Sequence, residues 1–172
     1  MVDKNKLLEN TNLIIYAAKL YQLNGDSINA LHFAEKALSN DSENSDILYF
    51  LGEVSKDLGD LDKAIDYLFK SITINPFNGK KYVLLSQLFE NRRDYKRAID
   101  ILLEGLDILP EDYDLLKYSG ILLYKQGRHK EANSILEKAM EINAADTELE
   151  NIKHILDNSM QIKMNQTRIL EV

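Results

Sequence analysis

The sequence has no cysteine and no tryptophan, and among its 172 residues there are only two prolines and seven glycines. Without cysteine the chain has no disulfide framework, no thiolate metal site and no cysteine nucleophile. The longest apolar runs, such as 13–15 and 121–123, fall far short of the roughly 20 residues of a membrane-spanning helix. The first residues lack the basic and then apolar layout of a signal peptide. From these absences we expect no membrane span and a cytoplasmic location.

The chain also lacks an excess of positive charge. Lysine and arginine together number 21 and aspartate and glutamate 28, which gives a net charge of −7 at pH 7. Because nucleic acids are bound largely through their phosphates, this balance argues against a nucleic-acid partner. The 45% of hydrophobic residues is enough to bury a core, so the composition excludes a fully disordered chain.

No pattern of catalytic or metal-binding residues is present. The three histidines, His32, His129 and His154, are too far apart for the i, i+4 spacing of two metal ligands on a helix. The glycines are scattered rather than gathered into a phosphate-binding loop, and no serine has the context of a nucleophile elbow. We therefore expect a protein that is not an enzyme and has no metal and no cofactor.

What the sequence does contain is a repeat. The two prolines, Pro76 and Pro110, are 34 residues apart, and the same period runs through the chain. Three columns of recurring residues are Ala30, Ala64, Ala98 and Ala132; Ala18, Gly52, Ser86 and Gly120; and Gly25, Gly59, Arg93 and Gly127. Four units follow one another without an insertion, at 11–44, 45–78, 79–112 and 113–146.

Each unit has the pattern of two helices. In the second unit one helical series of apolar residues is followed by another, and these are Ile47, Leu48, Leu51, Val54 and Leu58, then Leu61, Ala64, Ile65, Leu68, Phe69 and Ile72. Gly59 suits the end of the first helix, and Asp60 or a neighbour suits the cap of the second. Pro76 cannot continue a helix and marks the exit. The small column predicts that the paired helices cross closely at Gly52 and Ala64.

This pattern resembles the tetratricopeptide repeat. The motifs are Leu48-x2-Leu51-Gly52, Ala64-x3-Leu68 and Pro76; Tyr82-x2-Leu85-Ser86, Ala98-x3-Leu102 and Pro110; and Leu116-x2-Ser119-Gly120 with Ala132-x3-Leu136. The resemblance covers residues 11–146. It implies an all-α fold, a right-handed α-solenoid of four tetratricopeptide-like helix-turn-helix repeats, and a function in protein–protein interaction as an adaptor or scaffold.

After the last repeat the small columns stop, but an amphipathic pattern continues. Its apolar positions in the segment 147–164 are Leu149, Ile152, Leu156 and Met160. Because a repeat array needs a terminal element with a polar outer face, we predict a C-terminal capping helix over 147–164. Residues 1–164 are then expected to form a single solenoid, followed by a mobile tail at 165–172.

The first helices of stacked repeats line a concave surface, where we expect another protein or a peptide segment to bind. The positions predicted to face it are Asn12, Ile15, Lys19, Gln22, Asp46, Tyr49, Glu53, Lys56, Lys80, Val83, Gln87, Glu90, Asp114, Lys117, Ile121 and Tyr124. The six predicted contact residues are Tyr49, Tyr124, Lys19, Lys80, Lys117 and Glu53, because aromatic rings beside polar groups suit a peptide groove. The alternative is that this strip is only solvated.

Family members that bind chaperone tails use a carboxylate clamp of Lys, Asn, Asn, Lys and Arg. At the matching places this chain has Ile15, Lys19, Phe50, Lys80 and Leu84, of which only Lys80 agrees. One repeat further along, the set is Tyr49, Glu53, Leu84, Asp114 and Tyr118. We therefore expect no carboxylate clamp.

The end of the chain supports an alternative function. The tail is unusually apolar for a free terminus, with Met160, Ile162, Met164, Ile169 and Leu170. It can be read as a segment that docks on a neighbouring copy, which would make the protein a self-assembling structural scaffold.

Overall fold

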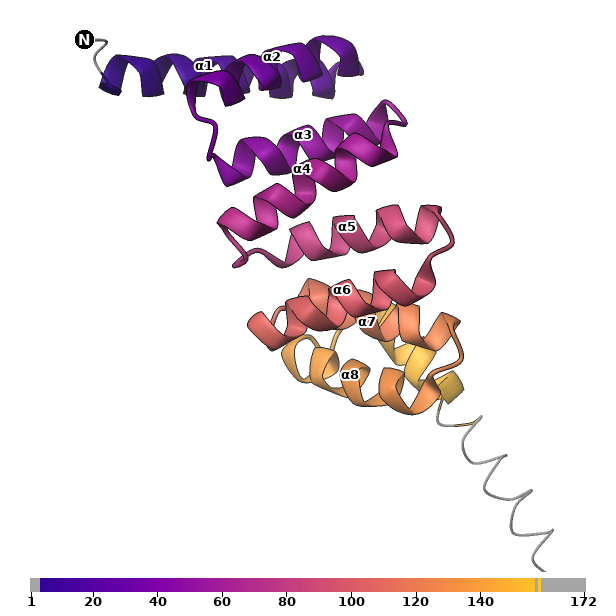
Figure 1. Ribbon diagram of the computed structural model, residues 1–172. Coiled ribbons are helices and arrows are strands. Elements are labelled where there is room, and N and C mark those ends of the chain that lie inside the picture. Colours follow the sequence, from indigo (N-terminus) through magenta and orange to yellow (C-terminus); the bar gives the residue numbers. More distant parts are fainter. Residues whose placement is uncertain (1–3, 157, 159–172) are drawn as a thin grey trace, which may run out of the picture. The chain divides into compact units, whose positions relative to one another are not determined.

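The computed structural model describes residues 4–156 and 158, with side chains from residue 10 onward. The described residues form helices and no strand (Figure 1). The named helices are α1 (Lys4–Leu23), α2 (Ser27–Asn40), α3 (Ser45–Asp57), α4 (Leu61–Ile74), α5 (Gly79–Asn91), α6 (Tyr95–Ile108), α7 (Tyr113–Lys125) and α8 (His129–Ile142). A further helical segment covers 147–156, within the predicted capping helix. The rest of that predicted helix and the predicted tail at 165–172 lie outside the described residues.

The chain divides into two compact units, residues 1–94 and 95–172. In the first unit α1 packs on α2 and α3 on α4, while α2 also contacts α3 and α4 contacts α5. In the second unit α7 packs on α8 and contacts α6. The predicted repeats 11–44 and 45–78 correspond to the first two helix pairs, and 113–146 corresponds to α7 and α8. The repeat 79–112 contributes α5 to one unit and α6 to the other, so the single solenoid over 1–164 stays a prediction.

The predicted turn column ends the first helix of each pair. Gly59 has a φ of +79°, and the N–H groups of Gly59 and Asp60 donate to the carbonyls of Lys56 and Ser55 at 2.9 Å each. These two hydrogen bonds close the helix around a residue in the left-handed conformation, which glycine adopts without strain. Asp60 then caps α4 by accepting a hydrogen bond from the Lys63 N–H at 3.2 Å, as predicted. At the third position of the column Arg93 has a φ of 59° and is the one non-glycine residue with positive φ in the described chain.

The predicted close crossing of paired helices is confirmed at Gly52. A β-carbon added to Gly52 would lie 2.8 Å from Cγ of Leu68 and 3.4 Å from the carbonyl oxygen of Ala64. Gly120 has the same relation to Leu136, whose Cγ would lie 2.6 Å from such a β-carbon. The glycines in this column therefore make room for the leucine of the second helix.

One charged side chain in the core of the first unit was not expected from the sequence. Lys81 of α5 is fully buried, and its ammonium donates to Ser45 Oγ of α3 and, at 2.9 Å, to the carbonyl oxygen of Asn75. Ser45 and Ser71 also exchange hydrogen bonds between their hydroxyls and main-chain oxygens, at 3.0 and 2.6 Å. Burial lowers the pKa of Lys81, against the smaller opposing effect of Asp46. These bonds tie α5 to the pair formed by α3 and α4.

Candidate functional site

The predicted inward positions of the first unit lie on α1, α3 and α5. All twelve keep solvent exposure, and they are Asn12, Ile15, Lys19, Gln22, Asp46, Tyr49, Glu53, Lys56, Lys80, Val83, Gln87 and Glu90. The three helices are connected, because α3 contacts α5 and the Gln22 side-chain amide donates to Asp57 Oδ2 at 3.0 Å. We call this set of twelve residues the first-helix face.

Three of the six predicted contact residues come together on this face. The Tyr49 hydroxyl donates a hydrogen bond of 3.1 Å to Glu53 Oε1, one turn further along α3, and both side chains are half-buried. Lys19 of the neighbouring helix α1 is exposed and lies within electrostatic range of the Glu53 carboxylate. The group formed by Lys19, Tyr49 and Glu53 therefore brings a ring, a carboxylate and an ammonium from two helices to one place.

The electrostatics of this group follow from its partial burial. Burial raises the pKa of Glu53, while the Tyr49 hydrogen bond and the positive charges of Lys56 and Lys19 act in the opposite direction. Burial also raises the pKa of Tyr49, and the adjacent Glu53 charge adds to this rise. Among the described residues Glu53 has no ion pair, so its carboxylate carries a desolvation cost that no single cation offsets. Lys80, the remaining predicted contact residue of this unit, is exposed at the start of α5.

The two contact residues predicted in the second unit have different surroundings. The Lys117 ammonium lies 2.7 Å from Asp146 Oδ2 and 2.8 Å from Glu148 Oε2. The Tyr113 hydroxyl donates to the same Asp146 oxygen, and these bonds raise the pKa of Lys117 and lower that of Asp146. Lys117 thus fastens the start of the 147–156 helix to α7. Tyr124 is half-buried, with its ring centroid 5.6 Å from that of His129.

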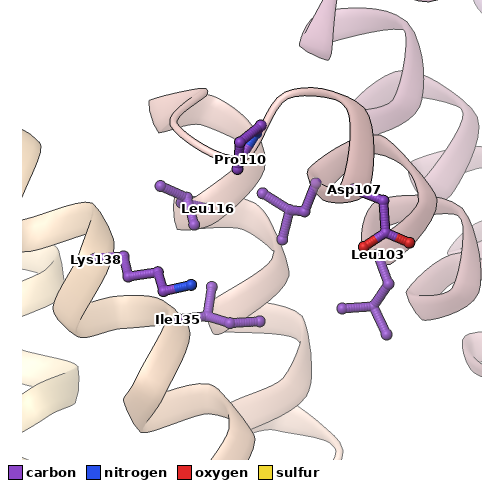
Figure 2. Close-up of a pocket in the computed structure, with 7 residues that line it drawn as sticks. Leu103, Asp107, Pro110, Leu116, Ile135 and Lys138 are labelled. Atoms are coloured by element: carbon purple, nitrogen blue, oxygen red, sulfur yellow. The ribbon is translucent and has the colours of Figure 1, made fainter.

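A cleft of about 370 Å³ in the second unit was missed by sequence reasoning. Its lining residues are Leu103, Leu106, Asp107, Pro110, Leu116, Ile135 and Lys138. Figure 2 shows Lys138 extending from α8 beside Ile135, and Asp107 on the opposite rim. The residues come from three helices and a connection, so no helical period links them. Only the apolar pair Leu103 and Leu106, one turn apart on α6, gives a signal in the sequence.

The described chain has neither a cluster of metal-ligating side chains nor a helix that could cross a membrane. Within residues 10–156 and 158 there is no group of three or more histidine, aspartate or glutamate side chains placed to hold a metal ion. No helix in this part of the protein combines the length and the apolar character that crossing a membrane requires.

Comparisons with known proteins agree with the repeat pattern. The tetratricopeptide repeat model matches residues 45–78 and 119–146. No curated protein matches the sequence. Among solved structures, one of MamA protein superposes with a TM-score of 0.75 at 20% identity, covering 95% of this chain and 89% of that chain.

Two other solved structures show the same likeness. YrrB, a tetratricopeptide repeat protein with an unusual peptide-binding site, gives a TM-score of 0.66 at 21% identity, covering 86% of this chain and 76% of that one. A tetratricopeptide repeat protein from Parabacteroides merdae ATCC 43184 gives 0.77 at 17% identity, covering 95% and 65%. These likenesses confirm the predicted fold class, an all-α solenoid of helical repeats.

Proposed function

Because the chain belongs to the tetratricopeptide repeat family, we propose that it is a non-enzymatic protein–protein interaction module that binds a peptide segment of a partner on its first-helix face. Proteins of this family are generally interaction modules rather than enzymes, and one structural relative, YrrB, has a peptide-binding site. The observation that carries the proposal is the group formed by Lys19, Tyr49 and Glu53.

The chemistry of this group favours a partner segment with a lysine or arginine side chain. Glu53 is half-buried and has no ion pair among the described residues, so a cation from a partner would stabilise its charged form. The Tyr49 ring beside it offers a face for a guanidinium or ammonium group. The net charge of −7 favours the approach of a basic segment. Lys19 and Lys56 then place positive charge where acidic flanking residues of the segment can pair.

The test begins with a library of peptides bound to the full chain, followed by affinity measurements on the selected peptides. Glu53→Gln keeps a hydrogen-bond acceptor for Tyr49 but removes the charge, and we expect it to weaken binding about tenfold. Asp66→Asn is the matched control, because it removes an exposed carboxylate from α4, outside the first-helix face. If the selected peptides contain no lysine or arginine, or bind equally to both variants, the proposal is wrong.

Of the other predicted contact residues, this proposal keeps Lys80 as a peptide contact and does not rest on Lys117 or Tyr124. Lys80 is exposed on the same face and remains a candidate contact. Lys117 already pairs with two carboxylates, which favours a role in holding the last helix, and Tyr124 lies beside His129 in the second unit. The absence of a carboxylate clamp is supported by the burial of Phe50 and Leu84, which stand at two of the clamp positions.

The alternative function, self-assembly through the apolar tail, rests on residues outside the described part of the chain. It therefore stays a prediction, as does the cytoplasmic location. A chain ending at residue 158 tests the tail directly, because tail-driven assembly would disappear in it.

A further inference from the structure

Helix α1 carries an exposed apolar stripe. Leu13, Tyr16, Leu20 and Leu23 are 70%, 63%, 43% and 82% exposed. Their 3-4-3 spacing places all four on one side of the helix. We call these four residues the α1 stripe.

The repeat period shows what normally covers this side of a first helix. The positions one or more repeats further along from Leu13, Tyr16 and Leu20 are Ile47, Phe50 and Val54; Lys81, Leu84 and Leu88; Leu115, Tyr118 and Leu122; and Leu149, Ile152 and Leu156. Phe50 and Val54 are 4% and 0% exposed and belong to one core cluster with Ala34 and Ala37 of α2.

The later copies of this set face the second helix of the preceding repeat in the same way. α5 contacts α4, α7 contacts α6, and Lys153 of the last helical segment donates to Asn133 of α8 at 2.8 Å. Only the first copy has no preceding helix of the described chain against it (Figure 1). Within the described chain, Leu13, Tyr16 and Leu20 therefore stand at helix-packing positions that no helix covers.

Two residues, Leu23 of the stripe and Ile28 of α2, show that the first repeat carries more apolar surface than its register requires. Leu23 stands where the next three repeats have Asp57, Asn91 and Lys125. Ile28, at the start of α2 and 74% exposed, stands where they have Asp62, Lys96 and Lys130. Charged or polar side chains at both positions in the other repeats fit solvent, whereas leucine and isoleucine fit a contact surface.

We propose that the α1 stripe joins two copies of this chain through antiparallel packing of α1 against α1. The stripe is self-complementary in this orientation, because a two-fold axis between Tyr16 and Leu20 places Leu13 opposite Leu23 and Tyr16 opposite Leu20. Among the described side chains of α1 the only charged one is Lys19, which lies toward Glu53, so pairing two α1 helices brings no like charges together within the stripe.

A two-fold contact fits better than stacking of one end of the repeat series on the other. In the last helical segment Glu150 and His154 are exposed, at positions where the repeats have buried apolar or small residues such as Ile14 and Ala18. A head-to-tail contact would press these polar side chains against the α1 stripe. The exposed apolar area is also sufficient for a dimer. If each large apolar side chain has roughly 200 Å² of surface, the exposed fractions of the four residues give about 500 Å² per copy. Two copies then bury the ~1,000 Å² of a small specific interface.

The proposal is tested by analytical ultracentrifugation of the full chain over a range of concentrations. We expect a monomer–dimer equilibrium with a dissociation constant on the order of micromolar. Leu13→Glu combined with Leu23→Glu should raise this constant at least about a hundredfold without unfolding the monomer, because both side chains are exposed in it. Phe77→Glu is the matched control, since Phe77 is 72% exposed in the connection between α4 and α5. It should leave the dimer unchanged.

Introduced cysteines test the orientation, because the native chain has none. A mixture of a Leu13→Cys chain and a Leu23→Cys chain should form a disulfide-linked dimer under mild oxidation, whereas either chain alone should not. In ultracentrifugation, a monomer at every concentration, assemblies larger than a dimer, or a dimer that persists in the double glutamate variant would overturn the proposal. In cross-linking, a disulfide-linked dimer formed equally well by either cysteine variant alone would overturn it. A chain ending at residue 158 should still dimerise, and its failure to do so would assign assembly to the tail instead. Glu53→Gln leaves the α1 stripe intact and should dimerise like the wild type, so the test of dimerisation does not depend on the proposed peptide site.

Discussion

Replacing Gly52 by alanine tests the packing of paired helices most directly. The added methyl group would lie 2.8 Å from Cγ and 3.1 Å from Cδ2 of Leu68, well inside the ~3.5–4 Å of an ordinary carbon contact. Leu68 is fully buried and cannot swing away. Overpacking of this kind costs roughly 1–3 kcal/mol, and the better helix propensity of alanine offsets about 1 kcal/mol of it. We expect Gly52→Ala to lower the free energy of unfolding by about 1 kcal/mol.

The sign of the effect should reverse when Leu68 is shortened. Leu68→Ala alone removes a buried side chain and should cost about 2–5 kcal/mol. In that background the methyl group of Gly52→Ala meets no leucine, so its helix propensity remains as a gain of up to about 1 kcal/mol. The first repeat already has this combination, with fully buried Ala18 and Ala34 at the corresponding positions. The two substitutions should therefore be coupled by about 2 kcal/mol.

Urea unfolding of the four proteins, followed by circular dichroism and by tyrosine fluorescence, measures this coupling. Coincident transitions by the two probes justify a two-state treatment. Gly120→Ala and Leu136→Ala repeat the cycle in the second unit, where the contact is shorter still, with 2.6 Å to Cγ of Leu136. Gly52→Ala could instead destabilise the chain by the same amount whether residue 68 is leucine or alanine. In that case the clash with Leu68 is not the cause, and the reasoning fails.

Three further predictions concern single residues. Arg93→Gly should raise the free energy of unfolding by about 0.5–1 kcal/mol in urea unfolding, because it relieves a left-handed backbone at φ 59°. Since burial lowers the pKa of Lys81, the folded chain releases this proton before the unfolded chain does, so wild-type stability should rise relative to Lys81→Met as the pH approaches 10.5. Asp146→Asn keeps a helix cap but loses the Lys117 ion pair, so amide exchange over 147–156 should accelerate at neutral pH, and the difference from wild type should fade as the pH falls below 3.8.

The helices and their turns could be predicted because they depend on local patterns. The spacing of apolar residues, Gly59 with its positive φ and Pro76 beyond the end of α4 each act within a few residues of chain. The period then carried these assignments from one repeat to the next. Lys81 could not be predicted, because its burial depends on the Asn75 carbonyl and the Ser45 hydroxyl turning toward it from outside its own helix.

The candidate site was predictable to a similar extent. The register placed Tyr49 and Glu53 one turn apart on an exposed face, and the structure shows their hydrogen bond. Their distance from Lys19 depends on how α1 packs beside α3, and the sequence pattern of one helix does not predict this packing. Lys117 shows the limit most clearly, because its two carboxylates lie at the last residue of the final repeat and just beyond it, about 30 residues further along the chain.

A repeat period assigns a position to each residue but does not say whether its neighbour is present. One position of the first helices holds Leu13, Ile47, Lys81, Leu115 and Leu149 in turn. Four of these side chains are buried, including the charged one, whereas Leu13 is 70% exposed. The difference cannot come from the residue type, since Leu13, Leu115 and Leu149 are the same amino acid. It comes from the second helix that packs on each of the later four, whereas the described residues include no such helix before α1. The period therefore predicts burial correctly only where the neighbouring helix is present. Leu13, which no described helix covers, is exposed and free to pack against a second copy of the chain.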